Sequence, residues 1–437
     1  MIVADTPAPL TRTAVIRQLA RTDRAAAITE LTAFLQELFR IDVAGLKIND
    51  DRYSLNSLNG FFHSGKQAFF FKFHQEEGED MMSGEYYRAD LIAKAGLPVD
   101  LPIHMSAQSG EQILVYRMRN EPQFSDVLYK LDKVADAGME TTAIAAEIDL
   151  NTKILEVAKR TLTPVTPQQV HKEPIHRLFH DRLIDPKTKT APGGRYKRFY
   201  INQTFCFPGA TLEWDEFSNA NLVLNGQRMQ RTFGQIFDDA LVHLNPDNLT
   251  GAGGIVAHGD AHNANVWFEQ RGNTARLCYF DPAFAGEHVP SLLAEIKATF
   301  HNVFAHPLWL YDQQEAAKSF VAQARYENGT LELETDWHLT PIRQKLLAAK
   351  TNAFWKPFLR HLMNLDMLPA NWEDTVRSAL AMSPALVMNL RSGADRHNRV
   401  SSTIGFYVLA LAGSRPENGT NMFTDFFQKI NPETDGG

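Results

Sequence analysis

The chain has 437 residues, of which 44% are hydrophobic, and a formal net charge of −7 at pH 7. This length and composition suit two or three packed domains, and the acidic balance argues against a general nucleic-acid-binding protein. Two cysteines are too few for a disulfide framework, residues 1–21 lack the apolar core of a signal peptide, and no run approaches the ~18 apolar residues of a membrane helix. We therefore expect a cytoplasmic globular protein with neither nucleic acid nor membrane as a partner.

The amino-terminal part predicts a helix followed by a small antiparallel sheet. Apolar residues at helical spacing behind Asp23, a suitable cap, indicate an amphipathic helix over residues 22–40. The next segments are, in order, a polar connection over 54–60, a strand over 61–62, a turn over 63–67 and a strand over 68–74. A helix over 84–95 and a strand over 111–118 complete this part.

The segment Gly60–Gln67 almost fits a phosphate-binding P-loop. However, Gln67 stands where the motif needs a Ser or Thr for Mg²⁺, bulky Phe61 and Phe62 occupy the loop, and a strand follows where a helix is required. Each departure removes a physical part of a phosphate site. We therefore interpret the segment as a plain hairpin turn.

Lys72 lies within the apolar run Phe69–Phe73, where burial of an ammonium without an anionic partner is costly. One interpretation is a lysine on the solvent face of an edge strand. The other pairs Lys72 with Glu85 on the following helix. A strand lysine, a helix glutamate and an apolar strand occur in this order in the nucleotide-binding lobe of kinases, where the lysine contacts the phosphates.

Residues 121–235 give the weakest pattern. Between Lys172 and Arg198, eight Lys or Arg stand against three acidic residues, a Pro-Gly-Gly turn begins at Pro192, and residues 195–201 alternate like a strand. A solvated charged face is the simpler explanation. The alternative is a surface for an anionic acceptor or partner, to which a polycationic aminoglycoside would be poorly matched.

The stretch over residues 254–282 carries the strongest functional signal. A short buried strand over 255–257 leads into a polar loop, His258 to Asn265, and two β-favouring runs separated by a turn then predict a hairpin. Because neighbouring strands lie about 4.8 Å apart, Asn265 at the start of the hairpin and Asp281 at its end should be neighbours. Together with Asp260 they form an all-oxygen set that suits Mg²⁺.

The same loop offers a zinc set, because His258, Asp260 and His262 supply three potential ligands within five residues.

Beyond Asp281 the sequence pattern predicts a series of helices, with segments at 292–304, 342–362, 375–390 and 403–412. Pro357 is expected to kink the second of them. The aromatic residues Trp309, Tyr311, Trp337, Trp355 and Trp372 are expected to lie mostly in the core.

These segments together resemble the aminoglycoside phosphotransferase and choline-kinase-like branch of the protein-kinase-like fold. The strongest match is the loop His-Gly-Asp-Ala-His-Asn-Ala-Asn over residues 258–265. In the family an aspartate follows His-Gly, a second histidine follows two residues later, and an asparagine three beyond that. A hydrophobic hairpin then ends in a metal-binding aspartate, here Asp281. The resemblance covers residues 50–120 and 235–310.

The resemblance implies an α+β, two-lobed architecture. A helical extension (1–45) would precede an N-lobe with a small antiparallel sheet (46–120). A mostly helical C-lobe (121–437) would contain an insertion at 121–235 and the catalytic-loop hairpin.

By the same resemblance, Asp260 would orient and deprotonate the acceptor hydroxyl, while Asn265 and Asp281 would hold Mg²⁺ on ATP. Lys72 would contact the α- and β-phosphates and Glu85 would hold it in place. His258 and His262 would support the loop.

Further nucleotide contacts are implied for the loop that carries Ser57 and Asn59, and for the hinge backbone near Arg117 and Met118. The loop over residues 54–60 has one glycine, which resembles the Ser/Asn-bearing loop of the antibiotic kinases more than a protein-kinase Gly-rich loop. A protein substrate is therefore less favoured.

The favoured hypothesis is an ATP- and Mg²⁺-dependent kinase that phosphorylates a hydroxyl of a small molecule, with an anionic acceptor as one option. A protein substrate or nucleotidyl transfer is its nearest rival. A non-catalytic nucleotide-binding pseudokinase and a His/Asp metal-dependent hydrolase are the alternatives from other classes.

Overall fold

The computed structural model describes residues 11–49, 57–74, 88–106, 111, 113–306 and 308–435. The chain forms two compact units. Unit 1 contains residues 1–90 and 99–121, and unit 2 contains residues 91–98 and 122–437, so the division falls within helix α3 (Ala89–Lys94).

Two helices open unit 1, and a polar side chain caps each of them. Thr11 accepts a hydrogen bond from Ala14 N at the start of α1 (Arg12–Thr22), and Asp23 accepts one from Ala26 N at the start of α2 (Arg24–Phe39). Such caps satisfy backbone donors that a helix leaves unpaired at its start. The prediction of a helix behind Asp23 is confirmed, whereas α1 was not predicted.

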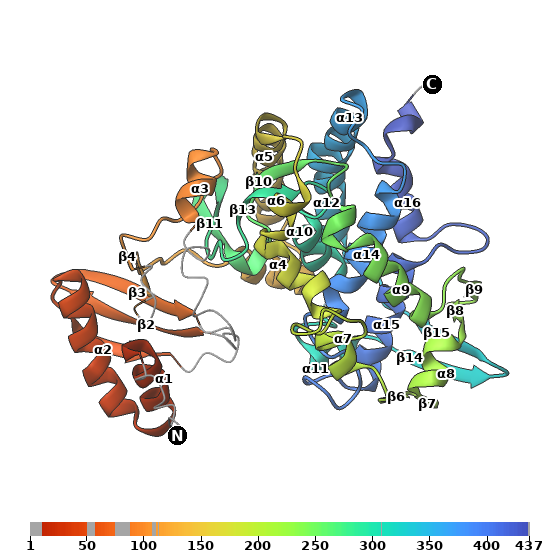
Figure 1. The fold of residues 1–437 in the computed structure, drawn as a ribbon, viewed down its shortest axis with the longest axis horizontal. Helices are drawn as coiled ribbons and strands as arrows, with labels where there is room; N and C mark the ends of the chain where they lie inside the picture. Colours follow the sequence, from red (N-terminus) through yellow and green to blue (C-terminus); the bar gives the residue numbers. More distant parts are fainter. Residues whose placement is uncertain are drawn as a thin grey trace, which may run out of the picture. The chain divides into compact units, whose positions relative to one another are not determined.

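The sheet of unit 1 is antiparallel throughout, with the strand order β1-β2-β3-β5-β4. Its strands are β1 (Ala44–Ile48), β2 (Ser57–Ser64), β3 (Gln67–His74), β4 (His104–Ser106) and β5 (Ile113–Arg117). Figure 1 shows α1 and α2 lying against this sheet. The expected small antiparallel sheet is confirmed.

The prediction of a polar connection over residues 54–60 is wrong for its second half. Residues 57–60 are part of β2, because Asn59 and Gly60 pair in register with Lys72 and Phe71 of β3. Residues 54–56 lie outside the described residues. The turn is shorter than expected and consists of Gly65 and Lys66, with Gly65 in the left-handed region at φ 58°. The P-loop-like segment is thus a β-hairpin, as predicted.

One face of this sheet forms the core of unit 1. Phe62, Phe69 and Phe71 are buried there against α1 and α2, in one cluster that includes Leu31 and Phe34. Because side chains alternate along a strand, Lys72 points to the opposite face from Phe71.

Unit 2 contains a long helix that the sequence pattern did not predict, α5 (Ala137–Thr161), which follows α4 (Phe124–Lys133). Asp136 caps α5 through a 3.0 Å hydrogen bond from Met139 N. Its buried side chains recur at helical spacing but include several alanines, which weakens the hydrophobic signal.

The predicted strand over residues 195–201 is wrong, because residues 194–199 form the short helix α7 (Gly194–Phe199). Tyr196, Phe199 and Tyr200 are all buried. Their spacing of three and four residues places them on one helical face, so the apparent alternation of the segment was half of a helical pattern.

A small β-rich region of unit 2 gathers segments that are far apart in sequence. A hairpin of β6 (Thr204–Phe207) and β7 (Ala210–Glu213) lies beside a four-stranded sheet, β14 (Ala322–Glu327), β15 (Thr330–Thr335), β8 (Asn221–Leu224) and β9 (Gln227–Arg228). The ring of Phe406 meets Phe205, Phe217 and Phe233 edge to face, with centroids 5.0 to 5.6 Å apart. Such aromatic packing accounts for the burial of this region.

The rest of unit 2 is mostly helical. The helices are α6 (Pro167–His171), α8 (Trp214–Asn219), α9 (Phe233–His243), α10 (Ile296–Thr299), α11 (Gln313–Ser319), α12 (Pro341–Lys350), α13 (Lys356–Asn364), α14 (Trp372–Ala385), α15 (Arg399–Gly413) and α16 (Met422–Ile430). The α+β architecture is therefore as expected, with a small antiparallel sheet in one unit and a mainly helical second unit.

Several helix boundaries differ from the prediction. Residues 292–295 are turns, and α10 continues into a π-helical segment, Phe300–Phe304. A second π-helical segment, Thr351–Trp355, joins α12 to α13 just before Pro357. Pro357 thus lies inside an unbroken helical run over residues 341–364, directly after a π-helical segment, where the changed hydrogen-bond pattern can accommodate its missing N–H.

Four of the five aromatic residues expected in the core are buried. Trp309, Trp337, Trp355 and Trp372 are at most 9% exposed, whereas Tyr311 is 41% exposed. Among the described residues, no helix is both long and apolar enough to cross a membrane.

Candidate functional site

Two paired strands of unit 2 frame the predicted loop. The buried strand β10 (Gly254–Ala257) runs antiparallel to β13 (Gly286–Pro290), with Ile255 opposite Val289. Residues 258–285 therefore leave and re-enter the same two-stranded ladder. The loop and the hairpin are held at one place in the unit.

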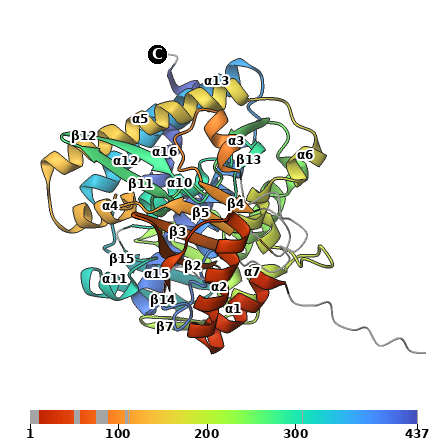
Figure 2. The same ribbon diagram turned by 90° about the vertical axis from the view of Figure 1, so that its left-hand side faces the viewer.

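The predicted hairpin is confirmed. β11 (Val266–Arg271) and β12 (Thr274–Tyr279) pair from Val266 opposite Tyr279 to Arg271 opposite Thr274, and Gly272 and Asn273 form the turn. Helix α5 runs alongside the hairpin (Figure 2), and Thr142 Oγ1 donates to Asn273 O at 3.3 Å.

The register places Asn265 opposite Phe280, the residue that precedes Asp281. Phe280 N donates to Asn265 O at 3.0 Å, one step beyond the last strand pair, so Asp281 follows directly after the residue that bonds to Asn265. Asn265 Nδ2 donates to Asp260 O at 3.0 Å, which leaves Oδ1 as the acceptor of that amide. A carboxylate beside an amide oxygen is the donor chemistry that Mg²⁺ takes from proteins.

His258 is unsuited to zinc in this arrangement. Its Nε2 lies 3.0 Å from Phe280 O, and its Nδ1 accepts from Asp260 N at 3.4 Å, so the backbone uses both ring nitrogens. Burial lowers the pKa of His258, which keeps the ring neutral as these bonds require. Among the described residues, no group of three or more His, Cys, Asp or Glu is placed to hold a metal ion.

Gly259 is required by the shape of the loop. It lies between His258 and Asp260 at φ 78°, and a Cβ atom there would be 2.4 Å from Phe284 O. Both the backbone conformation and the close approach therefore exclude a side chain. This glycine therefore determines the path of the chain between the end of β10 and Asp260.

A buried polar network anchors the other end of the loop. Asn263 N donates to Asn302 Oδ1 at 2.7 Å, and Asn302 O accepts from Arg343 Nη1 at 2.6 Å. Arg343 forms a bidentate ion pair with Asp132 at 2.6 and 3.1 Å, with both side chains 1% exposed. Thr340 Oγ1 also donates to Asp132 Oδ1 at 2.7 Å. The loop is thereby tied to α4 and α12.

A cluster that the sequence analysis missed lies beside Asp260. His262 Nε2 is 3.8 Å from Asp260 Oδ2, and the rings of His262 and His301 are 5.9 Å apart. His301 in turn bonds to Tyr311 Oη and, at 3.4 Å, to Lys297 Nζ. The sequence signal was the presence of Lys297 and His301 four residues apart in a mainly apolar helical segment.

The basic segment divides into two kinds of residue. Lys172, Lys187, Lys189, Lys197 and Arg198 are exposed, as a solvated face requires. Arg182 and Arg195 instead donate to Leu386 O at 3.1 and 2.9 Å, just beyond the end of α14. Cations at a helix carboxyl end satisfy open carbonyls and the helix dipole.

In unit 1, Lys72 lies on the central strand β3 between β2 and β5, so the edge-strand interpretation is wrong. It is partly exposed and lies opposite Asn59 of β2. Asn59 is buried and its Oδ1 accepts from Asn49 Nδ2 at 2.8 Å. Lys72 and Asn59, which are both nucleotide-site candidates, therefore lie on one face of the sheet.

The other nucleotide-site candidates of unit 1 have mixed outcomes. Glu85 lies outside the described residues, and Ser57 begins β2. Arg117 is the last residue of β5. The backbone N–H of Met118 donates to Ala68 O at 2.9 Å, so this N–H is already used in a hydrogen bond to β3. An adenine contact near Arg117 and Met118 would have to use other backbone groups.

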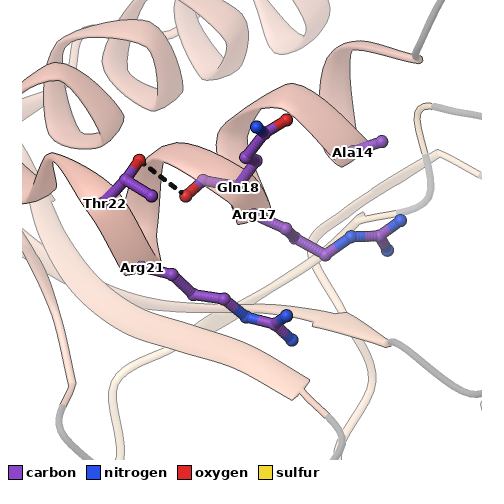
Figure 3. A pocket seen from close by; sticks show the side chains of 5 residues that line it. All are labelled: Ala14, Arg17, Gln18, Arg21 and Thr22. Atoms are coloured by element: carbon purple, nitrogen blue, oxygen red, sulfur yellow. Dashed lines mark hydrogen bonds between the residues drawn. The ribbon is translucent and has the colours of Figure 1, made fainter.

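Two surface depressions are lined by residues outside the loop. One is on α1 and is lined by Ala14, Arg17, Gln18, Arg21 and Thr22 (Figure 3). The other lies between α5 and α12 and includes Ile148, Lys345 and Asn352. Neither contains a residue that the sequence analysis selected.

No model of a known protein family and no curated protein matches the chain. Solved structures do match it along most of its length. A spectinomycin phosphotransferase in complex with ADP and spectinomycin has a TM-score of 0.42 at 12% identity, covering 92% of this chain and 98% of its own. An aminoglycoside phosphotransferase in ternary complex with AMP-PNP and hygromycin B has a TM-score of 0.44 at 13% identity, covering 87% and 98%. An ethanolamine kinase from Plasmodium vivax has a TM-score of 0.42 at 9% identity, covering 98% of each chain.

Replacement of Gly259 by Ala should destabilise the protein and disorder the loop. The left-handed conformation alone costs a β-carbon about 1–2 kcal/mol, and overlap with Phe284 O adds to it. Gly272→Ala is the matched control, because Gly272 has φ 59° but nothing within 4 Å of the added carbon. Urea unfolding should show a larger loss for Gly259→Ala; equal losses would mean that the contact with Phe284 is unimportant.

Replacement of Arg343 by Met should cost about 3–5 kcal/mol of unfolding free energy, because Asp132 would remain buried without its counter-ion. The double variant Arg343→Met, Asp132→Leu should lose less than the sum of the two single variants. Breaking the exposed pair of Arg325 and Glu332 should cost about 0–1 kcal/mol. Chemical denaturation of the wild type, the two single variants, the double variant and an Arg325→Met control gives these losses; additive losses would show that the buried pair is not coupled.

Proposed function

We propose that the protein is an ATP- and Mg²⁺-dependent phosphotransferase that phosphorylates a hydroxyl group of a small molecule. The observation that carries the proposal is the hairpin register, in which Phe280 N bonds to Asn265 O and Asp281 is the next residue; a separate bond joins the Asn265 amide to the Asp260 carbonyl. Phosphoryl transfer needs positioned groups and charge neutralisation more than covalent catalysis. A base and an oxygen ligand in the loop, with a second oxygen ligand just after the hairpin, are suited to that task.

In the proposed reaction, the Asp260 carboxylate orients the acceptor hydroxyl and accepts its proton. The acceptor oxygen forms a bond to the γ-phosphorus of ATP, the bond from that phosphorus to the β,γ-bridging oxygen breaks, and ADP leaves with the electron pair. The Asp260 side chain is 18% exposed, so a small acceptor can reach it. Mg²⁺ held by Asn265 Oδ1 and the Asp281 carboxylate would supply charge neutralisation.

The nucleotide contacts of the proposal rest on the sequence resemblance. Lys72 is assigned to the α- and β-phosphates and Glu85 to its support, with Ser57, Asn59, Arg117 and Met118 as further candidates. The central place of β3 supports Lys72, because a buried strand holds a side chain more rigidly than an edge strand does.

Replacement of Asp260 by Asn should lower phosphoryl transfer about 10²–10⁴-fold, because the amide cannot accept the proton. ADP release from ATP would be measured against a panel of polyols, hydroxy acids, amino alcohols, sugars and aminoglycosides, with and without Mg²⁺. Asp366→Asn is the matched control, since Asp366 is exposed and its φ of 56° suits Asn.

Each alternative has its own result in this experiment. Equal transfer by wild type and Asp260→Asn would show that Asp260 has no catalytic role. ATP binding with no transfer to any of these small molecules would favour the pseudokinase or a protein substrate, and transfer of a nucleotidyl group would appear as pyrophosphate in place of ADP. Stoichiometric zinc with no ATP binding would overturn the kinase proposal.

A further inference from the structure

Lys297 is a buried ammonium in unit 2 that has no function in the proposed reaction. It is 1% exposed, and it forms no ion pair within the described part of the chain. Its Nζ lies 3.3 Å from Ser383 O and 3.4 Å from His301 Nε2, with the Phe179 ring 5.3 Å away. These three direct contacts are to uncharged groups. Burial of an ammonium without a directly contacting carboxylate is costly, so the position of Lys297 requires an explanation.

His301 is held from both edges of its ring. Lys297 contacts Nε2, and Tyr311 Oη contacts Nδ1. An ammonium can only donate, so Nε2 must be the acceptor while Lys297 is charged. The ring proton then lies on Nδ1, and the Tyr311 oxygen accepts it. The pair of contacts selects one neutral tautomer of His301.

The held ring lies next to the catalytic loop. His301 and His262 have ring centroids 5.9 Å apart, and His262 Nε2 is 3.8 Å from Asp260 Oδ2. His301 is 4% exposed, so its ring has little room to turn. A continuous set of contacts thus runs from Lys297 through His301 and His262 to Asp260.

We propose that Lys297 is a positioning residue of the phosphotransfer site: its hydrogen bond fixes the tautomer and orientation of His301, and His301 in turn fixes His262 beside Asp260. The catalytic consequence rests on the proposed function, whereas the tautomer does not. The role is regulatory as well, because the ammonium is present only below the pKa of Lys297.

Electrostatics support this geometry. Burial lowers the pKa of Lys297 to about 7; Asp260 raises it, and Arg182 and Arg195 lower it. Burial, with Lys297 next, lowers the pKa of His301 well below its usual value, so this ring stays neutral. The titratable and charged groups that face the pair are Asp260, His262, His306, Tyr311, Arg182 and Arg195. The tautomer is therefore fixed below about pH 7 and released as pH rises through that value.

A simpler role for Lys297 is to cap α14, since Ser383 O lies in its last turn. Arg182 and Arg195 also donate to carbonyls just after this helix. A capping role requires no contact with His301, and its loss would lower stability without changing the His301 tautomer. The capping role and the positioning role of Lys297 can therefore be distinguished by the protonation of the two ring nitrogens of His301.

The test is the nitrogen spectrum of the full-length protein labelled with ¹⁵N-histidine, recorded from pH 6 to 8.5, with the His301 signals assigned from their loss in His301→Gln. In the wild type at pH 6, Nδ1 of His301 should be protonated and Nε2 should not. Lys297→Met should abolish this fixed pattern and shift the His262 signals. Tyr311→Phe, which leaves Lys297 in place, should keep the Nδ1 tautomer.

His397 is the internal control, because it is also a buried histidine but bonds to Ser401. Its signals should not change in Lys297→Met. A wild-type His301 that is protonated at Nε2 or doubly protonated at pH 6 would overturn the proposal, even if Lys297→Met fails to fold. Identical His301 and His262 signals in the wild type and Lys297→Met would overturn it too.

Kinetics test the catalytic consequence. Lys297→Met should lower kcat about tenfold with the KM for ATP unchanged, since small misplacements of catalytic groups reduce turnover. In the wild type, kcat should also fall as pH rises through about 7, and the variant should lack this fall. Full turnover with an unchanged pH profile would overturn the positioning role. If the wild type transfers no phosphoryl group, the proposed function fails while the tautomer result still stands.

Discussion

The hydrogen bond from Phe280 N–H to the Asn265 carbonyl determines which side chains meet in the candidate site. A shift of one residue in the β11–β12 register would turn every side chain of one strand to the other face and separate Asn265 from Asp281. Strands β10 and β13 fix where this hairpin starts and ends. The packing of unit 2 around these strands therefore stabilises one register of the β11–β12 hairpin.

Some of that support is costly to the fold. Asp281 adopts φ 55° directly before Pro282, a conformation that costs a residue other than glycine about 1 kcal/mol or more. Buried ions add to the cost, because Arg343 with Asp132, and Lys350 with Glu295 at 2.7 Å, all leave water. Buried pairs of this kind rarely add stability over apolar residues, but they specify geometry. Here Arg343 of the first pair also donates to the carbonyl of Asn302, and the Asn302 side chain accepts from the backbone N–H of Asn263 in the loop.

The sequence was sufficient for features that depend on local order. Alternation, turn residues and spacing correctly predicted the β11–β12 hairpin and the cap at Asp23, because each depends on residues close together in the chain. The sequence was insufficient where tertiary packing determines the secondary structure of a segment. The segment after Gly194 alternates like a strand but folds as α7, and residues 57–60 look like a loop but pair in register with β3. The cluster of His262, Lys297 and His301 is brought together only by the fold.

The carboxyl end of α14 explains how so much positive charge can gather near Asp260. Lys297, Arg182 and Arg195 reach carbonyls in or just after its last turn, where the helix dipole contributes about half a negative charge. Burial lowers the pKa of Lys297 to about 7, Asp260 opposes this shift, and Arg182 and Arg195 add to it. Cations at this helix end would favour an acceptor that carries a negative charge over a polycationic one, which relates Arg182 and Arg195 of the basic segment to the chemistry proposed for the loop.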